Sequence, residues 1–138
     1  MEAGFLIGLD YGTESARGVL LDASTGELVA SHSHPYRHGV MTEALPNGRP
    51  LPPAWALQCA PDYVAAAEAL FEAFGRGRRV RGIGVGFTAS TPMPTGPDGA
   101  PLSEAFPDEP HAYVKLWKHH AAQPVSYTHL TLPTILRV

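Results

Sequence analysis

Apolar residues near the N-terminus fall into short runs separated by polar turns. The first run, residues 5–10, ends on Asp10, and the second, residues 17–22, begins after a short polar stretch. A Ser-Thr-Gly turn then leads into a third run, residues 27–33. Because the connections are this short, the pattern predicts an antiparallel meander of three strands.

Helical periodicity follows a proline-rich stretch. Apolar side chains then share one helical face, namely Tyr63, Ala67, Leu70, Phe71 and Phe74. Asp62 is the expected capping residue at the start of this helix, and Gly75 is its expected stop.

One further strand is predicted after this helix, over residues 80–87, where glycine alternates with apolar residues. A second helix is expected to open near His111 and to carry the segment YVKLWKHHAAQ. Glycine and proline cluster in residues 46–61 and 92–110, which we interpret as loops. A meander, a helix and a strand that can lie parallel to the first indicate an α/β fold.

Composition narrows the class of protein. The 138 residues suffice for one compact domain, and 44% are apolar, which argues against disorder. The net charge of −3 argues against nucleic-acid binding. A single cysteine, Cys59, excludes a disulfide within the chain and suits a reducing cytoplasm. We expect no membrane partner, since no segment has the pattern of a signal peptide or a membrane span.

The polar turn between the first two strands has the residue types of a phosphate site. Gly12 allows a ligand to approach the backbone, and the amides near Thr13 and Ser15 can form an anion-binding concavity. Arg17 can hold a phosphate oxygen, and Asp10 can hold a hydrated Mg²⁺. An ordinary polar hairpin is the alternative, which residue types alone do not exclude.

A second polar apex follows the glycine-rich strand in the segment GIGVGFTASTPMP, residues 82–94. Its glycines are not a dinucleotide fingerprint, because they lie within a strand and prolines follow where a helix would open. Thr88, Ser90 and Thr91 place hydroxyl groups at the carboxyl end of the strand, where ligands of open α/β sheets gather. A strand that runs into a capped loop is the alternative.

Histidines offer a weaker signal. His32, His34 and His38 form H-x-H-x3-H, a possible metal-ligand set, but no fourth ligand is evident. His119 and His120 are either structural or line a cleft, and the sequence leaves this open.

Several segments together carry a family resemblance. LDYGTESARGVLLD resembles the first phosphate motif of the actin, Hsp70 and sugar-kinase superfamily. With PYRHGV, WALQ, DYV, GIGVGFTAST and VKLWKHHAAQ in this order, residues 7–123 resemble the bacterial ribulokinases of the FGGY carbohydrate kinases. The resemblance implies a ribonuclease-H or actin-like α/β fold in two domains around a cleft. It also implies transfer of the γ-phosphate of ATP, with Mg²⁺, to O5 of L-ribulose or a related ketopentose, in arabinose catabolism.

The resemblance also assigns residues. The nucleotide side comprises Asp10, Gly12, Thr13, Glu14, Ser15 and Arg17, with Asp10 holding Mg²⁺ through water. The sugar side comprises Thr88, Ala89, Ser90 and Thr91, with Trp117 and Lys118 nearby. One departure is Gly86, where the family usually has an acidic residue; either a partner of the site is lost or the sequence carries an error at this codon. A kinase of another pentulose or polyol, or a non-catalytic actin-like nucleotide-binding protein, stays open, as does a homo-oligomeric parent.

Residues 125–134, VSYTHLTLPT, share nothing with that family and resemble the in-frame translation of a transposase sequencing adapter. A natural β-rich tail is the alternative. We therefore expect residues 1–123 to be the N-terminal part of kinase domain I and residues 124–138 to be a non-native tail. Since the family's catalytic Asp and adenosine pocket would lie beyond residue 138, we expect this chain alone to be inactive.

Overall fold

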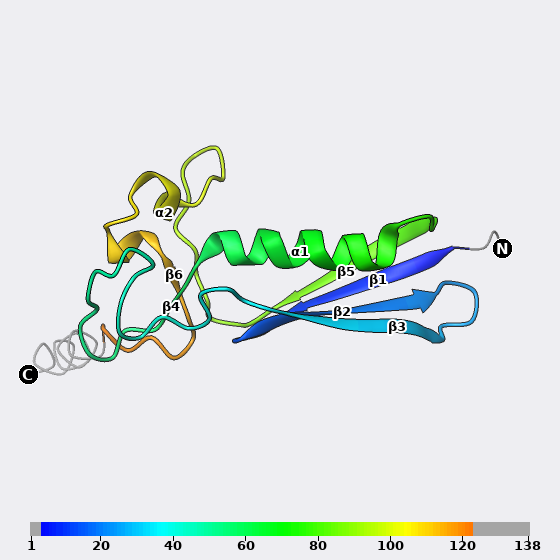
Figure 1. Cartoon of the computed structure of the whole chain (residues 1–138), viewed down its shortest axis with the longest axis horizontal. Helices are drawn as coiled ribbons and strands as arrows, with labels where there is room; N and C mark the ends of the chain where they lie inside the picture. The colour runs from blue at the N-terminus through cyan, green and yellow to red at the C-terminus, as the bar shows by residue number, and fades with distance from the viewer. Residues whose placement is uncertain (1–3, 123–138) are drawn as a thin grey trace, which may run out of the picture.

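A mixed four-stranded sheet forms the larger part of the molecule (Figure 1). The structure is a computed structural model, and it describes residues 4–122. The strand order is β3-β2-β1-β5, in which β1, β2 and β3 pair antiparallel and β5 pairs parallel with β1. The strands are β1 (Phe5–Tyr11), β2 (Ser15–Asp22), β3 (Leu28–Pro35) and β5 (Val80–Phe87). The predicted meander, parallel strand and α/β class are confirmed.

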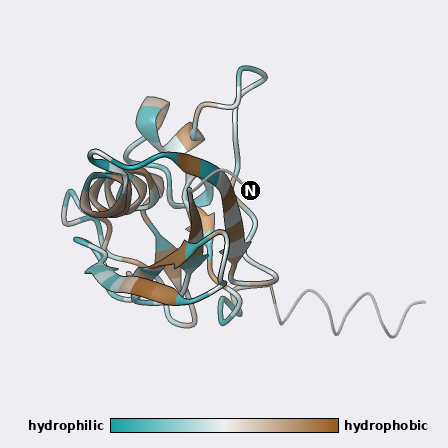
Figure 2. Ribbon diagram, turned by 90° about the vertical axis from the view of Figure 1, so that its right-hand side faces the viewer, coloured by the Kyte–Doolittle hydropathy of each residue, from teal (hydrophilic) through white to brown (hydrophobic). Residues whose placement is uncertain are grey.

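Helix α1 (Ala60–Gly75) lies along one face of this sheet, as Figure 2 shows with the helix seen end on. Alternate residues of β1 and β2 face it, because neighbouring strand residues point to opposite faces. The resulting core contains Ile7, Leu9, Tyr11, Ala16, Leu20, Ala66, Leu70 and Phe74. Of the apolar face predicted for this helix, Leu70 and Phe74 are buried, and the other three residues are half-buried against the core. The helix ends at Gly75 as expected.

The predicted cap of α1 is wrong. Cys59 is the N-cap and makes no side-chain capping bond, while Pro61 occupies the first turn, where its missing N–H costs nothing. Asp62 is the third residue of the helix, in the same first turn, and its carboxylate accepts hydrogen bonds from His38. The Asp62 carboxylate, which the local pattern assigned to the helix cap, is therefore bound instead by His38, a residue distant in sequence.

Strand β5 forms an edge of the large sheet and leaves apolar side chains in solvent. Ile83, Val85 and Phe87 are in register with the core residues of β1, yet they are 53%, 51% and 67% exposed. Helix α1 packs mainly on β2 and β3, so this side of β5 has no cover within residues 4–122.

A second, smaller unit lies at the end of the large sheet where α1 begins (Figure 1). It consists of the two-stranded sheet β4 (Leu57–Gln58) and β6 (Val114–Lys115), the short helix α2 (Leu102–Ala105) and a 3-10 turn, Pro110–Ala112. Its own core contains Met41, Leu45, Leu57, Cys59 and Tyr113.

The helix expected near His111 is not formed. After the 3-10 turn the chain is extended, and β6 pairs antiparallel with β4. The amides of Lys115 and Leu116 donate to the carbonyls of Pro92 and Ala56, which lie in other segments. Tertiary hydrogen bonds have overridden the local helical preference.

Helices within residues 4–122 are all too short or too polar to cross a membrane.

Candidate functional site

The turn between β1 and β2, residues 12–14, is tied down from the inside of the molecule. The Gly12 amide donates to the Ser15 carbonyl at 3.0 Å, and a Cβ at Gly12 would lie 3.0 Å from the same oxygen. The Gly12 carbonyl accepts from the Tyr36 hydroxyl at 3.1 Å. The Thr13 carbonyl accepts from the Gln58 side-chain amide at 2.7 Å. These hydrogen bonds hold the backbone path of the turn, and a side chain at Gly12 would crowd the Ser15 carbonyl.

Charged side chains flank this turn on the sheet face opposite α1. Asp10 and Arg17 are direct cross-strand partners, and both are exposed. Neither side chain forms a hydrogen bond or an ion pair with another residue of the described part of the chain. Glu14 is also exposed, and the Ser15 hydroxyl accepts from Ser33 at 3.5 Å. The sheet thus presents an unpaired carboxylate and an unpaired guanidinium at the predicted phosphate motif.

The second predicted motif lies beside the first. Strand β5 runs parallel to β1, and both the amide and the hydroxyl of Thr88 donate to the Tyr11 carbonyl, at 3.0 and 2.7 Å. The Thr91 hydroxyl donates to the backbone carbonyl of Ala89, and Ala89 itself is exposed. Ser90 is exposed and has a φ of 53°, which is uncommon for a side-chain-bearing residue.

A small hollow opens between the two motifs. It measures about 90 Å³ and is lined by Tyr11, Tyr63, Phe87, Thr88 and Thr91. The rings of Tyr11 and Phe87 stack at 4.9 Å. Two hydroxyl groups and aromatic walls are thus placed at the carboxyl ends of β1 and β5.

Gly86 lies directly beside Asp10 in the sheet. A Cβ built at Gly86 would lie 3.6 Å from the Asp10 carboxylate, which is ordinary contact distance. The position therefore has room for a side chain, and an acidic one would stand next to Asp10.

Trp117 joins the sugar-side set to the nucleotide-side set. Its ring N–H donates to the Thr13 hydroxyl at 3.3 Å, although its side chain is 55% exposed. Lys118 is half-buried and makes no hydrogen bond or ion pair within residues 4–122.

Sequence reasoning missed three residues that hold the site, Tyr36, Gln58 and Tyr63. Burial raises the pKa of Tyr63 to about 12 and also raises the pKa of Tyr36, so both hydroxyls stay protonated as donors. The segments PYRHGV, WALQ and DYV contained them, but a pattern along the chain does not show which carbonyl each side chain reaches.

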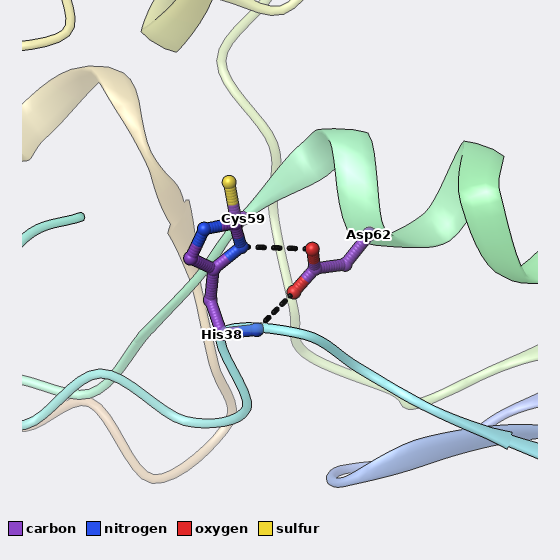
Figure 3. Close-up of side chains that lie close together, drawn as sticks. All are labelled: His38, Cys59 and Asp62. Carbon is purple, nitrogen blue, oxygen red and sulfur yellow. Dashed lines mark hydrogen bonds and ion pairs between the residues drawn. The ribbon is translucent and has the colours of Figure 1, made fainter.

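His38, Cys59 and Asp62 form a separate cluster at the N-terminal end of α1 (Figure 3). One candidate ligand atom from each lies within 4.8 Å of the others. However, both oxygens of Asp62 already accept from His38, one from the ring Nδ1 at 2.8 Å and one from the backbone N–H at 2.9 Å. Burial also raises the pKa of Cys59 to about 11, which favours the neutral thiol over the thiolate that metals bind. The cluster is therefore best explained as a structural link between the loop after β3 and the start of α1.

The structure also places three of the other histidines, His32, His34 and His119. His32 and His34 lie on β3, while His38 is turned to Asp62, so the H-x-H-x3-H set is not assembled. The Nδ1 of His119 accepts from the Ala56 amide at 3.2 Å, and its ring packs edge-on against Trp55. Burial lowers the pKa of His119, and we assign it a structural role.

Ribulokinases are among the curated proteins to which the chain is similar. The chain is 47% identical over 131 residues to a ribulokinase of Halalkalibacterium halodurans. This alignment covers 89% of this chain and 23% of that protein. It is 45% identical over 130 residues to a ribulokinase of Mycolicibacterium smegmatis, with 87% and 23% covered. It is 40% identical over 126 residues to ribulokinase 1 of Staphylococcus saprophyticus, with 86% and 23% covered.

Among solved structures, gluconate kinase from Lactobacillus acidophilus has a similar fold, with a TM-score of 0.72 at 18% identity. The match covers 94% of this chain and 23% of that one. No protein-family model matches the chain. The chain thus spans less than a quarter of the length of these relatives.

Proposed function

Because the chain is a homologue of the N-terminal part of ribulokinases, we propose that it forms the N-terminal part of an ATP-dependent ketopentose kinase that phosphorylates L-ribulose at O5. The observation that carries this proposal is the juxtaposition of the two polar motifs. The nucleotide-side turn after β1 and the hydroxyl-rich apex after β5 adjoin on neighbouring parallel strands. Phosphoryl transfer requires donor and acceptor to meet in this way.

The turn fits the phosphates of a nucleotide with Mg²⁺. The exposed, unpaired carboxylate of Asp10 suits a hydrated Mg²⁺, which prefers oxygen ligands. The Thr13 and Glu14 amides donate to no residue of the described chain, and Arg17 supplies a positive charge on the same face as Asp10. MgATP supplies the transferable phosphoryl group, whereas these residues bind and orient its phosphates and offset their charge.

We assign sugar recognition to the apex after β5. Thr88, Ala89, Ser90 and Thr91 stand at the carboxyl end of that strand, and Trp117 is held against the turn from the small sheet. By family resemblance, the group that orients the sugar hydroxyl and the adenosine pocket come from parts of the parent enzyme outside these 138 residues. We therefore propose that this chain alone does not phosphorylate sugar, and that the parent works in the cytoplasm, in arabinose catabolism.

Two other functions remain as rivals. The hydroxyl-rich apex is equally compatible with another pentulose or a polyol, and an actin-like nucleotide-binding protein without catalytic activity would share the turn. The hydroxyl-rich apex disfavours the second rival, since it is not needed to bind nucleotide alone.

The test is an assay of the uninterrupted parent enzyme with L-ribulose, D-ribulose, xylulose and glycerol. We expect turnover that depends on ATP, Mg²⁺ and a ketopentose, with L-ribulose preferred. Turnover confined to glycerol, or ATP hydrolysis indifferent to every sugar, would contradict the proposal.

A further inference from the structure

The side chain of Gln58 is a buried bridge between the β1–β2 turn and the rest of the molecule. It is 1% exposed, its nitrogen donates to the Thr13 carbonyl at 2.7 Å, and its oxygen accepts from the Tyr63 hydroxyl at 2.6 Å. Tyr63 thereby fixes which end of the amide faces the turn, because a hydroxyl that donates to the oxygen leaves the nitrogen for the carbonyl.

Tyr36 holds the preceding peptide of the turn in the same manner. Its hydroxyl donates to the Gly12 carbonyl at 3.1 Å, and its own amide donates to the Glu14 carbonyl at 3.0 Å. Two successive carbonyls, those of Gly12 and Thr13, are thus drawn toward protein donors.

The geometry of the peptide bond carries this constraint to the other side of the turn. In a trans peptide the C=O of one residue and the N–H of the next point in opposite directions. Holding the Gly12 and Thr13 carbonyls inward therefore directs the Thr13 and Glu14 N–H groups away from those donors. Neither N–H donates to another residue of the part that the structure describes. Successive free amides of this kind make an anion-binding concavity.

The small sheet supplies this restraint from outside the large one. Gln58 belongs to β4, which pairs with β6 through Gln58 and Val114. Trp117 follows β6 and donates to the hydroxyl of Thr13, the residue whose carbonyl Gln58 holds. The turn is therefore held by two elements that are distant from it in sequence.

We propose that Gln58, oriented by Tyr63, is a positioning residue that presets the Thr13 and Glu14 amides for a phosphate group of the nucleotide. This inference rests on the proposed function, since it assumes a nucleotide at the turn. Gln58 acts through the backbone and does not touch the ligand.

The test compares binding of MgADP and AMP to the uninterrupted parent enzyme, because only a nucleotide with further phosphates gains from these amides. Gln58→Met removes both bonds at similar volume, and Gln58→Glu keeps an acceptor for Tyr63 but has no donor for Thr13. We expect both to weaken MgADP binding by about 5- to 30-fold, the factor for one or two kcal/mol. Binding of AMP and the KM for the sugar should stay within about twofold, while kcat falls.

Tyr113→Phe is the matched control. Tyr113 is also a buried tyrosine of the small unit, and its hydroxyl donates to the Pro107 carbonyl at 2.9 Å, away from the turn. Tyr113→Phe should lower thermal stability about as much as the Gln58 variants do. It should leave the ratio of MgADP to AMP affinity unchanged. If the Gln58 variants lose both ligands alike, or keep the wild-type ratio, Gln58 is only structural and the inference is wrong.

Two further measurements cover the remaining outcomes. Should the Gln58 variants fail to fold, Tyr63→Phe removes only the hydroxyl that orients Gln58, and an unchanged affinity ratio there would overturn the inference. Should the wild-type enzyme bind no nucleotide, the proposed function fails first. Hydrogen exchange then reports the turn directly: faster exchange of the Tyr36 amide in Gln58→Met than in Tyr113→Phe supports positioning, and equal exchange contradicts it.

Discussion

At the residue scale, Asp10 carries the sharpest prediction. Its carboxylate is exposed at the end of β1, opposite Arg17, and lacks a protein partner within residues 4–122. In the parent enzyme we expect Asp10→Asn to lower kcat about a hundredfold or more, because organising Mg²⁺ and phosphates contributes several kcal/mol in the transition state. The KM for the sugar should change little. Steady-state kinetics test this, and near-normal turnover would reduce Asp10 to an acid at a strand end.

Gly86 gives a second prediction at this scale. Because a Cβ there would stand 3.6 Å from the Asp10 carboxylate, Gly86→Asp places two acids side by side without a backbone clash. Paired carboxylates repel each other unless a cation lies between them, so the substitution should lower the Mg²⁺ concentration needed for half-maximal rate. The control is Gly86→Asn, which has a similar size but no charge. Equal Mg²⁺ dependence in the two variants would contradict the electrostatic explanation.

At the element scale, the close contact between α1 and β2 requires that residue 18 of β2 has no side chain, as in glycine. A Cβ at Gly18 would lie 2.5 Å from the Phe74 ring and 3.0 Å from Leu70. Gly18→Ala should therefore destabilise the parent enzyme by about 1–3 kcal/mol through overpacking. Gly84→Ala is the control, since nothing lies within 4 Å of its Cβ position on β5. Thermal unfolding of both variants checks this, and equal midpoints would show that the helix shifts to accommodate the methyl group.

Elements with local causes were predictable from the sequence. The meander and α1 follow from short turns and apolar periodicity, so strands and helix appeared within a few residues of their predicted bounds. The chain near His111 was not predictable in this way, because its conformation depends on pairing with β4, more than fifty residues earlier. The candidate site likewise has a part that local sequence predicts and a part that depends on distant residues. Asp10, Gly12 and Thr13 belong to one contiguous motif, whereas Gln58 reaches the turn across 45 positions.

At the scale of the whole molecule, we propose that residues 124–138 do not belong to the fold. Residues 123–138 lie outside the described part of the chain, so the proposal rests on the sequence. Chains of residues 1–123 and 1–138 should show equal solubility and equal sensitivity to protease, and neither should phosphorylate a sugar. Loss of folding on removal of the tail, or sugar phosphorylation by the 138-residue chain, would show the proposal wrong.

The uncovered side of β5 has a consequence for how a parent enzyme is made. In relatives about four times as long as this chain, a ribosome working at about 5–20 residues per second needs tens of seconds to complete the polypeptide after the corresponding segment emerges. Throughout that interval Ile83, Val85 and Phe87 would stand on an open sheet edge, where a second nascent chain can pair. Synthesis on crowded polysomes should therefore favour misassembly, and slower initiation or a chaperone that shields this strand should raise the yield of active enzyme.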